Sequence, residues 1–306
     1  VKVLNNLILG NYAAAGDGAG IRLSRVNGQD IAMYEPAQWY SAVIFNNMIA
    51  NNVAALAGGG ISLQDVIRAR IVHNTIANND STATAGEAFT PGQPSQSSPK
   101  PAGIVSRAHS PAILAQLPGW VPGFSDPVLR DNIIWHNRSF YFEIVPGDPP
   151  QYLLTESGYN DLSVLGTPTE QKLNPLYCIL TSAAGYDPSN MIGDPDFVLG
   201  YLNGNRGQTV IPGEPTTALQ PAIAFDEGGN YIKVRYGPLT LTDDPTPGDG
   251  MPGQTIDYHI SPDSPAIDAG IDLTGNYPIT GVDYDLETRP NGEEVDVGAD
   301  EYYDAP

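Results

Sequence analysis

The sequence predicts an all-β protein built as a parallel β-solenoid, in which short strands stack turn upon turn around one core. Pairs of asparagines five residues apart recur four times, and in every pair an isoleucine follows the first asparagine by two positions. The 306 residues also include 33 glycines and 28 prolines, a composition that favours frequent turns over long helices.

The repeat predicts where each side chain lies. The asparagine pairs are Asn6/Asn11, Asn47/Asn52, Asn74/Asn79 and Asn132/Asn137, and the isoleucines are Ile8, Ile49, Ile76 and Ile134. Stacked strands place equivalent side chains about 4.8 Å apart, so we expect the isoleucine column to fill the core. We expect the asparagines to lie at turns in left-handed backbone conformations, with their amides hydrogen-bonded down each column.

A second short strand of the same unit follows the first three asparagine pairs, whereas aromatic residues follow the fourth. A glycine turn leads into an isoleucine in GAGIRL (18–23), GGGISL (58–63) and AGIVS (102–106). The pairs are 41, 27 and 58 residues apart, because loops such as 26–41 and 108–127 are inserted between units of roughly 20 to 30 residues. The second of these loops, which contains Trp120, is expected to pack as an ordered flap.

Charge narrows the classes of partner. With 14 Lys and Arg against 35 Asp and Glu, the net charge is −21, which repels nucleic acid and anionic membranes. Such a surface can recruit Ca²⁺, and Asp243, Asp244 and Asp249 form a candidate ligand group in a proline-rich loop. The sequence contains no run of about 18 apolar residues, so it predicts no membrane span. The single cysteine, Cys178, lies in an apolar stretch and is expected to be a buried, unreactive thiol.

The second half of the chain carries a different series of motifs. These are DNIIWHN (131–137), GYND (158–161), DPDFV (194–198), SPAIDAG (264–270), RPNG (289–292) and DVGADEY (296–302). In order and spacing they resemble bacterial right-handed parallel β-helix proteins with a choice-of-anchor-type C-terminal region. The earlier glycine and asparagine repeats are similar to those of polymorphic outer-membrane proteins.

The resemblance implies a right-handed parallel β-helix on the bacterial cell surface or outside the cell. We expect coils with inserted loops over 1–145, and C-terminal coils over 146–306 with a long insertion at about 199–255 and a terminal cap. DVGADEY is expected to be the last strand, with Tyr284 and the tyrosine pair 302–303 capping the end of the core. The chain begins at Val1 within a repeat, so we expect it to be part of a longer exported protein.

Catalytic motifs are weakly represented. The acid pairs and Gly-His-Gly pattern of polygalacturonase-like enzymes do not occur, and the four histidines show no metal-ligand spacing. Two pairs on the repeat strands remain as candidates for lyase chemistry, namely Arg130 with Asp131 and Arg68 with Arg70.

Binding is the other option for a long solenoid face. Trp39, Tyr40 and Trp120 fall in inserted loops, where aromatic rings can stack on sugars. The sequence therefore favours a non-catalytic structural or adhesive module of a surface layer, sheath or filament. Its expected partners are polysaccharide, other surface proteins or further copies of itself. A polysaccharide lyase or glycoside hydrolase is the alternative.

Overall fold

The computed structural model describes residues 1–201, 256–273 and 281–303. Within these residues the protein consists mainly of short β-strands, with two short α-helices and two 3-10 helices in the loops. Most of the strands pair in parallel. The all-β class predicted from the repeats is confirmed. Among the described residues, no helix has the length and hydrophobicity needed to span a bilayer.

Three sheets, A, B and D, are parallel throughout. Sheet A contains, in spatial order, β1 (Lys2–Leu4), β5 (Ser41–Phe45), β9 (Arg68–Val72), β13 (Val128–Arg130) and β18 (Pro175–Leu176). Sheet B contains β2 (Leu7–Leu9), β6 (Met48–Ala50), β10 (Thr75–Ala77), β14 (Ile133–Trp135), β19 (Ile179–Leu180) and β20 (Met191–Ile192).

The other sheets carry the later strands of each pass. Sheet C contains β3 (Tyr12–Ala13), β7 (Val53–Ala54), β11 (Asp80–Ser81), β15 (Arg138–Val145) and β16 (Gln151–Tyr159), the last antiparallel to β15. Sheet D contains β4 (Ile21–Ser24), β8 (Ile61–Gln64), β12 (Ile104–Arg107) and β17 (Leu162–Leu165). A separate antiparallel pair joins β21 (Phe197–Leu199) to β22 (Asp257–Ile260).

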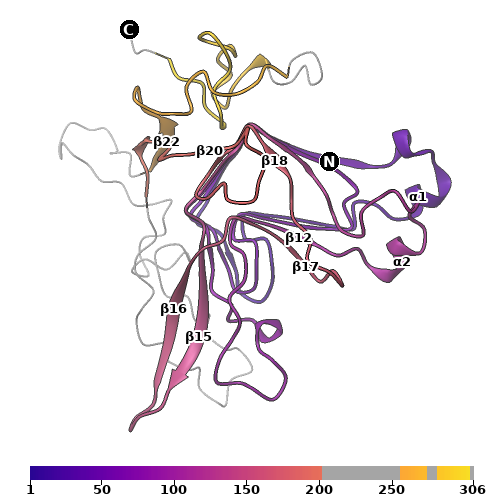
Figure 1. The fold of residues 1–306 in the computed structure, drawn as a ribbon, viewed down its shortest axis with the longest axis vertical. Coiled ribbons are helices and arrows are strands. Elements are labelled where there is room, and N and C mark those ends of the chain that lie inside the picture. The colour runs from indigo at the N-terminus through magenta and orange to yellow at the C-terminus, as the bar shows by residue number, and fades with distance from the viewer. Residues whose placement is uncertain (202–255, 274–280, 304–306) are drawn as a thin grey trace.

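The chain visits the sheets in a fixed order. It passes through A, B, C and D as β1 to β4, then as β5 to β8, then as β9 to β12, and each pass lays one strand beside its equivalent. A fourth pass begins with β13, β14 and β15, after which β16 turns back. Figure 1 shows this long hairpin projecting away from the stacked sheets. Strands β17, β18 and β19 then extend sheets D, A and B.

The isoleucine column forms the centre of the core, as predicted. Ile8 pairs with Ile49, Ile49 with Ile76, and Ile76 with Ile134, each at the middle of its strand in sheet B. The column continues to Leu180. These side chains belong to one buried cluster that also receives residues from sheets A and D. Strict register follows because a shift by one residue would turn every isoleucine outward.

Both predicted amide ladders form. In the first ladder, the Asn74 side-chain oxygen accepts from the Asn47 backbone N–H at 3.0 Å and from the Asn47 amide Nδ2 at 2.9 Å, and Asn132 does the same for Asn74. The second ladder runs from Asn11 through Asn52 and Asn79 to Asn137 with the same two contacts at each step. The ladders satisfy turn N–H groups that the parallel strands do not pair.

Different residues extend the ladders beyond the fourth copy. Cys178 replaces asparagine in the first ladder, where its thiol lies 3.4 Å from the Asn132 backbone nitrogen. The thiol is buried as predicted, and burial raises its pKa to about 12. Asp161 extends the second ladder by accepting from the Asn137 amide at 2.8 Å. Burial raises the pKa of this carboxyl above its ordinary value.

The prediction that ladder asparagines adopt left-handed backbone conformations is wrong by one residue. The positive φ angles belong to the residue before each ladder asparagine, namely Asn5, Asn46, His73 and Asp131 before the first ladder, and Asn51, Asn78 and His136 in three turns of the second. This residue makes the corner between two sheets, and its side chain leaves the turn on the side opposite the ladder. The two residues of a doublet such as Asn46-Asn47 therefore have different contacts. Asn47 joins the ladder, while the Asn46 amide donates to the Val282 carbonyl at 2.7 Å.

The C-terminal segment lies against the outer face of sheet B, which corrects two predictions. Residues 296–302 form no strand, and they do not extend the stack. Instead Val297 packs against Ile133 and Ile179 on that face, and Ala299 packs against Met48 and Ala77. Tyr284 also joins this lateral layer rather than capping the core. The central strands of sheet B are consequently buried on both faces, because alternate residues of each strand point into the core and toward the C-terminal segment (Figure 1).

The helices lie in the inserted loops. They are α1 (Gln29–Met33) and η1 (Pro36–Gln38) before β5, η2 (Gly86–Ala88) before β12, and α2 (Pro111–Leu114) before β13. Figure 1 shows α1 and α2 on the same side of the sheets. Ile31 of α1 and Ile113 of α2 belong to one buried cluster with Trp39, so the two loops support each other. The ordered flap predicted for residues 108–127 is confirmed.

Candidate functional site

The two helical loops bring together aromatic residues that are 81 positions apart in the sequence. Trp39 and Trp120 stack with ring centroids 6.1 Å apart and an interplanar angle of 8°. Trp39 is buried, and its indole N–H donates to the Tyr34 carbonyl at 3.0 Å. Trp120 is 68% exposed, and neighbouring Tyr40 is 55% exposed. Of the three rings predicted to bind a ligand, Trp39 and Trp120 are therefore in contact, and Trp120 and Tyr40 are open to solvent.

A buried carboxylate fixes the first loop. Asp30 accepts hydrogen bonds from the Gly28 and Tyr40 backbone N–H groups at 2.6 and 2.8 Å, and from the Asn27 amide at 2.8 Å. Burial acts to raise the pKa of Asp30, but these hydrogen bonds outweigh it and hold the pKa below its ordinary value. The start of the loop at Gly28 and the backbone just after Trp39 are thus held together before any ligand binds.

Two surface hollows meet at Trp39. One has a volume of about 240 Å³, and its lining includes Arg68, Trp120 and Asp126. The other, of about 660 Å³, is lined by Tyr40 and by two exposed arginines, Arg22 and Arg25, among others. We call this surface, made of Trp39, Tyr40 and Trp120 with Arg22, Arg25 and Arg68, the tryptophan flank.

The flank is cationic in an acidic protein. Three of the 14 Lys and Arg residues line its two hollows, and Asp126 is the one carboxylate among the lining residues. Arg68 also supports the loop, because its guanidinium donates to the Ala37 and Trp39 carbonyls at 2.6 and 3.1 Å. The sequence did not reveal this grouping, because the arginines come from separate strands and turns.

The catalytic candidates lie in a different place. Asp131 follows β13 and is fully buried, with one carboxylate oxygen accepting from the Ile271 N–H at 3.0 Å. Burial raises the pKa of Asp131 to about 7, despite the opposing effects of that hydrogen bond and of Arg130 and Arg289. The C-terminal segment covers this carboxyl, so a polymeric substrate has no access to it. Arg130 is half-buried.

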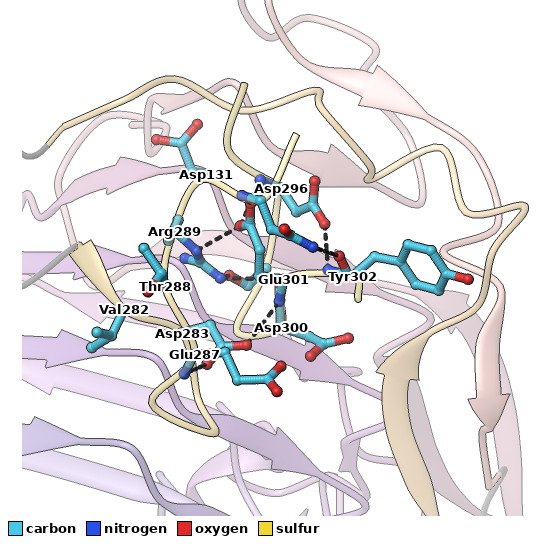
Figure 2. A network of polar contacts seen from close by, with 12 residues as sticks. Asp131, Val282, Asp283, Glu287, Thr288, Arg289, Asp296, Asp300, Glu301 and Tyr302 are labelled. Atoms are coloured by element: carbon cyan, nitrogen blue, oxygen red, sulfur yellow. Dashed lines mark hydrogen bonds and ion pairs between the residues drawn. The ribbon is translucent and has the colours of Figure 1, made fainter. Parts of the chain in front are cut away.

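Beside Asp131 lies a buried ionic centre around Arg289, shown in Figure 2. The Arg289 Nε is 2.9 Å from a Glu301 carboxylate oxygen, and its Nη2 donates to the Asp300 carbonyl at 2.9 Å. Glu301 also accepts from the Asn291 and Asp296 N–H groups at 2.7 and 3.0 Å. This carboxylate is used fully by the fold, which indicates a structural centre that ties the RPNG and DVGADEY motifs together.

Asp296 completes the same centre. Its carboxylate accepts from the Asp268 N–H at 2.6 Å and from the Tyr302 N–H at 2.7 Å. Burial raises its pKa to about 6, and Glu301 adds to this effect. The centre therefore links the SPAIDAG motif to the chain's last described residues through one carboxyl.

A group of possible metal ligands lies in the C-terminal segment. Asp243, Asp244 and Asp249, proposed from sequence, fall outside the described residues. Among the described residues, His259, Asp285 and Asp300 place one ligand atom each within 4.8 Å of one another. No spacing in the sequence predicts this group, because its members come from three separate segments.

Comparison with protein-family models, curated proteins and solved structures gives no match for this chain.

Proposed function

We propose that this protein is a right-handed parallel β-helix module of a bacterial surface or exported protein, and that it adheres to acidic polysaccharide through the tryptophan flank. The repeated visit of the chain to sheets A to D, with two amide ladders, supports the β-helix. The choice-of-anchor-type resemblance of the C-terminal motifs supports the surface location.

One observation carries the adhesive function, namely the exposed Trp120 stacked on a buried Trp39 beside arginines. An aromatic ring offers its apolar face to the C–H groups of a sugar ring, while arginine binds carboxylates through paired N–H donors. Trp39 and the Asp30 contacts hold this surface in place, so little conformational entropy is lost on binding. Uronate-containing chains fit both features, because they offer sugar faces and carboxylates together.

The catalytic alternative needs a different constellation. Inverting hydrolysis requires two carboxyls about 6.5 to 9.5 Å apart, and Asp126 is the one carboxylate among the residues lining the flank. Lyase chemistry would need a basic group beside an acid-bound cation, whereas the exposed Arg22 and Arg25 line a hollow that contains no carboxylate, and Arg68 donates to two backbone carbonyls. The flank therefore favours binding over turnover.

Native electrophoresis in gels containing polygalacturonate, alginate or neutral dextran tests the proposal. We expect the two acidic polymers to retard the protein and dextran to have little effect, with retardation that weakens as salt rises. Trp120→Ala should weaken the apparent affinity by about tenfold, equivalent to about 1.4 kcal/mol.

Tyr159→Ala is the matched control, because Tyr159 is 47% exposed and lies on β16, outside the flank. Equal retardation of wild type and Trp120→Ala would refute adhesion through the flank. Assays of new reducing ends and of unsaturated uronides run in parallel, and turnover that Trp120→Ala abolishes would establish the enzyme instead.

A further inference from the structure

A histidine and two aspartates meet where three parts of the C-terminal segment converge. His259 lies on β22, Asp285 follows Tyr284, and Asp300 belongs to the DVGADEY motif. Their nearest ligand atoms all lie within 4.8 Å of one another. A metal ion bound between them would have each of these atoms within reach of a coordinate bond after small side-chain movements.

The imidazole is oriented by a fourth residue. The His259 Nδ1 is hydrogen-bonded to the Asp257 carboxylate, and Nε2 lies 2.7 Å from an Asp285 carboxylate oxygen. A carboxylate on one ring nitrogen, with the other nitrogen directed into a ligand group, is the arrangement that surrounds histidine ligands of metals.

Asp300 supplies a buried ligand atom. Its side chain is 5% exposed, and its Oδ2 accepts from the Ile260 N–H at 2.8 Å. Among the described residues, this is the one hydrogen bond that its carboxylate accepts, while the backbone carbonyl of Asp300 accepts from Arg289. A buried carboxylate that accepts one hydrogen bond, close to an oriented imidazole, keeps acceptor capacity that a cation can use.

Charge around the group also favours a cation. His259 pairs with both Asp257 and Asp285, and Asp300 lies close by. One imidazole therefore faces three carboxylates. Even with a protonated ring, the group would keep excess negative charge, which a divalent ion would neutralise.

We propose that His259, Asp285 and Asp300 form a binding site for a divalent transition-metal ion of the Zn²⁺ class, oriented by Asp257. One nitrogen and two carboxylate ligands suit Zn²⁺ better than Ca²⁺, which takes six to eight oxygens. Because Asp285 is 44% exposed, a fourth position faces solvent, where water or a ligand oxygen completes the coordination. The bound ion would cross-link β22 to two loops of the segment that covers sheet B.

Titration of the full chain, freed of metal by a chelator and then dialysed, tests the site. Calorimetry with ZnCl2 should show one equivalent bound. At a 100-fold excess over the dissociation constant, the melting temperature should rise by about 5 °C. CaCl2 at the same concentration should produce no comparable shift, and Co²⁺ should develop the visible absorption bands of a low-symmetry nitrogen and oxygen site.

Two variants remove single ligands, and each has a matched control. Asp285→Asn and His259→Gln should each weaken Zn²⁺ binding by at least about tenfold. Asp263→Asn changes an exposed aspartate outside the group, and His136→Gln removes another partly exposed histidine, so both should bind as wild type. Circular dichroism checks that the variants are folded, and Asp285→Asn is the safer of the two because Asp285 is the more exposed side chain.

The outcomes separate clearly. No stoichiometric Zn²⁺ binding, or binding that Asp285→Asn leaves unchanged, would overturn the proposal and leave a protonated histidine held by aspartates. Loss of binding in His136→Gln but not in His259→Gln would place the ion elsewhere and equally overturn it. The proposal is independent of the tryptophan flank, because none of these variants alters that surface.

Discussion

The ladder asparagines should contribute very unequally to stability, and Asn74→Ala is the sharpest test. The Asn74 amide donates to the Val72 carbonyl at 2.9 Å, to the Ile44 carbonyl at 3.0 Å and to the Asn132 side chain at 3.0 Å. Its oxygen accepts twice from Asn47. Alanine removes all five contacts from a site with no solvent exposure.

The expected loss of stability in Asn74→Ala follows from the polar groups that lose their hydrogen-bond partner. The Asn47 backbone N–H loses its acceptor, and a buried orphan donor costs about 1 to 3 kcal/mol. Of the other contacts, two or three represent net losses of about 1 kcal/mol each, since the carbonyls have a second lone pair and some bonds share a hydrogen. We expect Asn74→Ala to lower the free energy of unfolding by about 4 kcal/mol.

Asn6→Ala is the matched comparison in the same ladder. Asn6 is exposed at the first turn and donates to the Leu4 carbonyl and to Asn47. Because water can replace these partners, the loss should stay below about 1 kcal/mol. Asn74→Asp, which keeps the size but loses the donors and adds a buried charge, should cost at least as much as alanine.

Urea denaturation followed by far-ultraviolet circular dichroism measures the three variants against wild type. Losses for Asn74→Ala and Asn6→Ala that agree within about 0.5 kcal/mol would refute the reasoning, because the buried ladder would then be no more important than its exposed end.

Three further outcomes are expected from the structure. Cys178→Asn should raise the melting temperature, because an amide at this position restores the ladder contact to Asn132 that the thiol makes weakly; a fall would show that the site cannot accept the larger side chain. Burial raises the folded-state pKa of Asp131 to about 7, so its contribution to stability falls as pH rises from about 4 to 7. Asp131→Asn should therefore stabilise the protein by about 4 kcal/mol at pH 8 but by less than about 1 kcal/mol at pH 4, and a gain independent of pH in paired urea titrations would contradict this assignment. Arg289→Met leaves Glu301 buried without its partner, so limited proteolysis should cut the C-terminal segment faster than in wild type, and unchanged cleavage would argue against its structural role.

The repeat predicted the all-β class and the stacking of equivalent strands from sequence alone, for a local reason. Each Asn and Ile of the unit contacts its own equivalent in the next repeat. The positions of Ile49 and Ile76 in the repeat therefore predict that these two residues are partners. The same holds for the ladder step from Asn47 to Asn74. Such contacts repeat with the chain, and periodicity alone reveals them.

Tertiary structure decided everything that the repeat does not encode. The contact between Trp39 and Trp120 depends on how two inserted loops leave the sheets, and the cluster at His259 depends on how three non-repeating segments converge. DVGADEY was expected as a last strand, yet it covers sheet B, because the outer residues of that sheet are apolar and need a partner. The sequence by itself determined the stacked strands through their period, while the sites depend on aperiodic contacts that only the folded chain brings together.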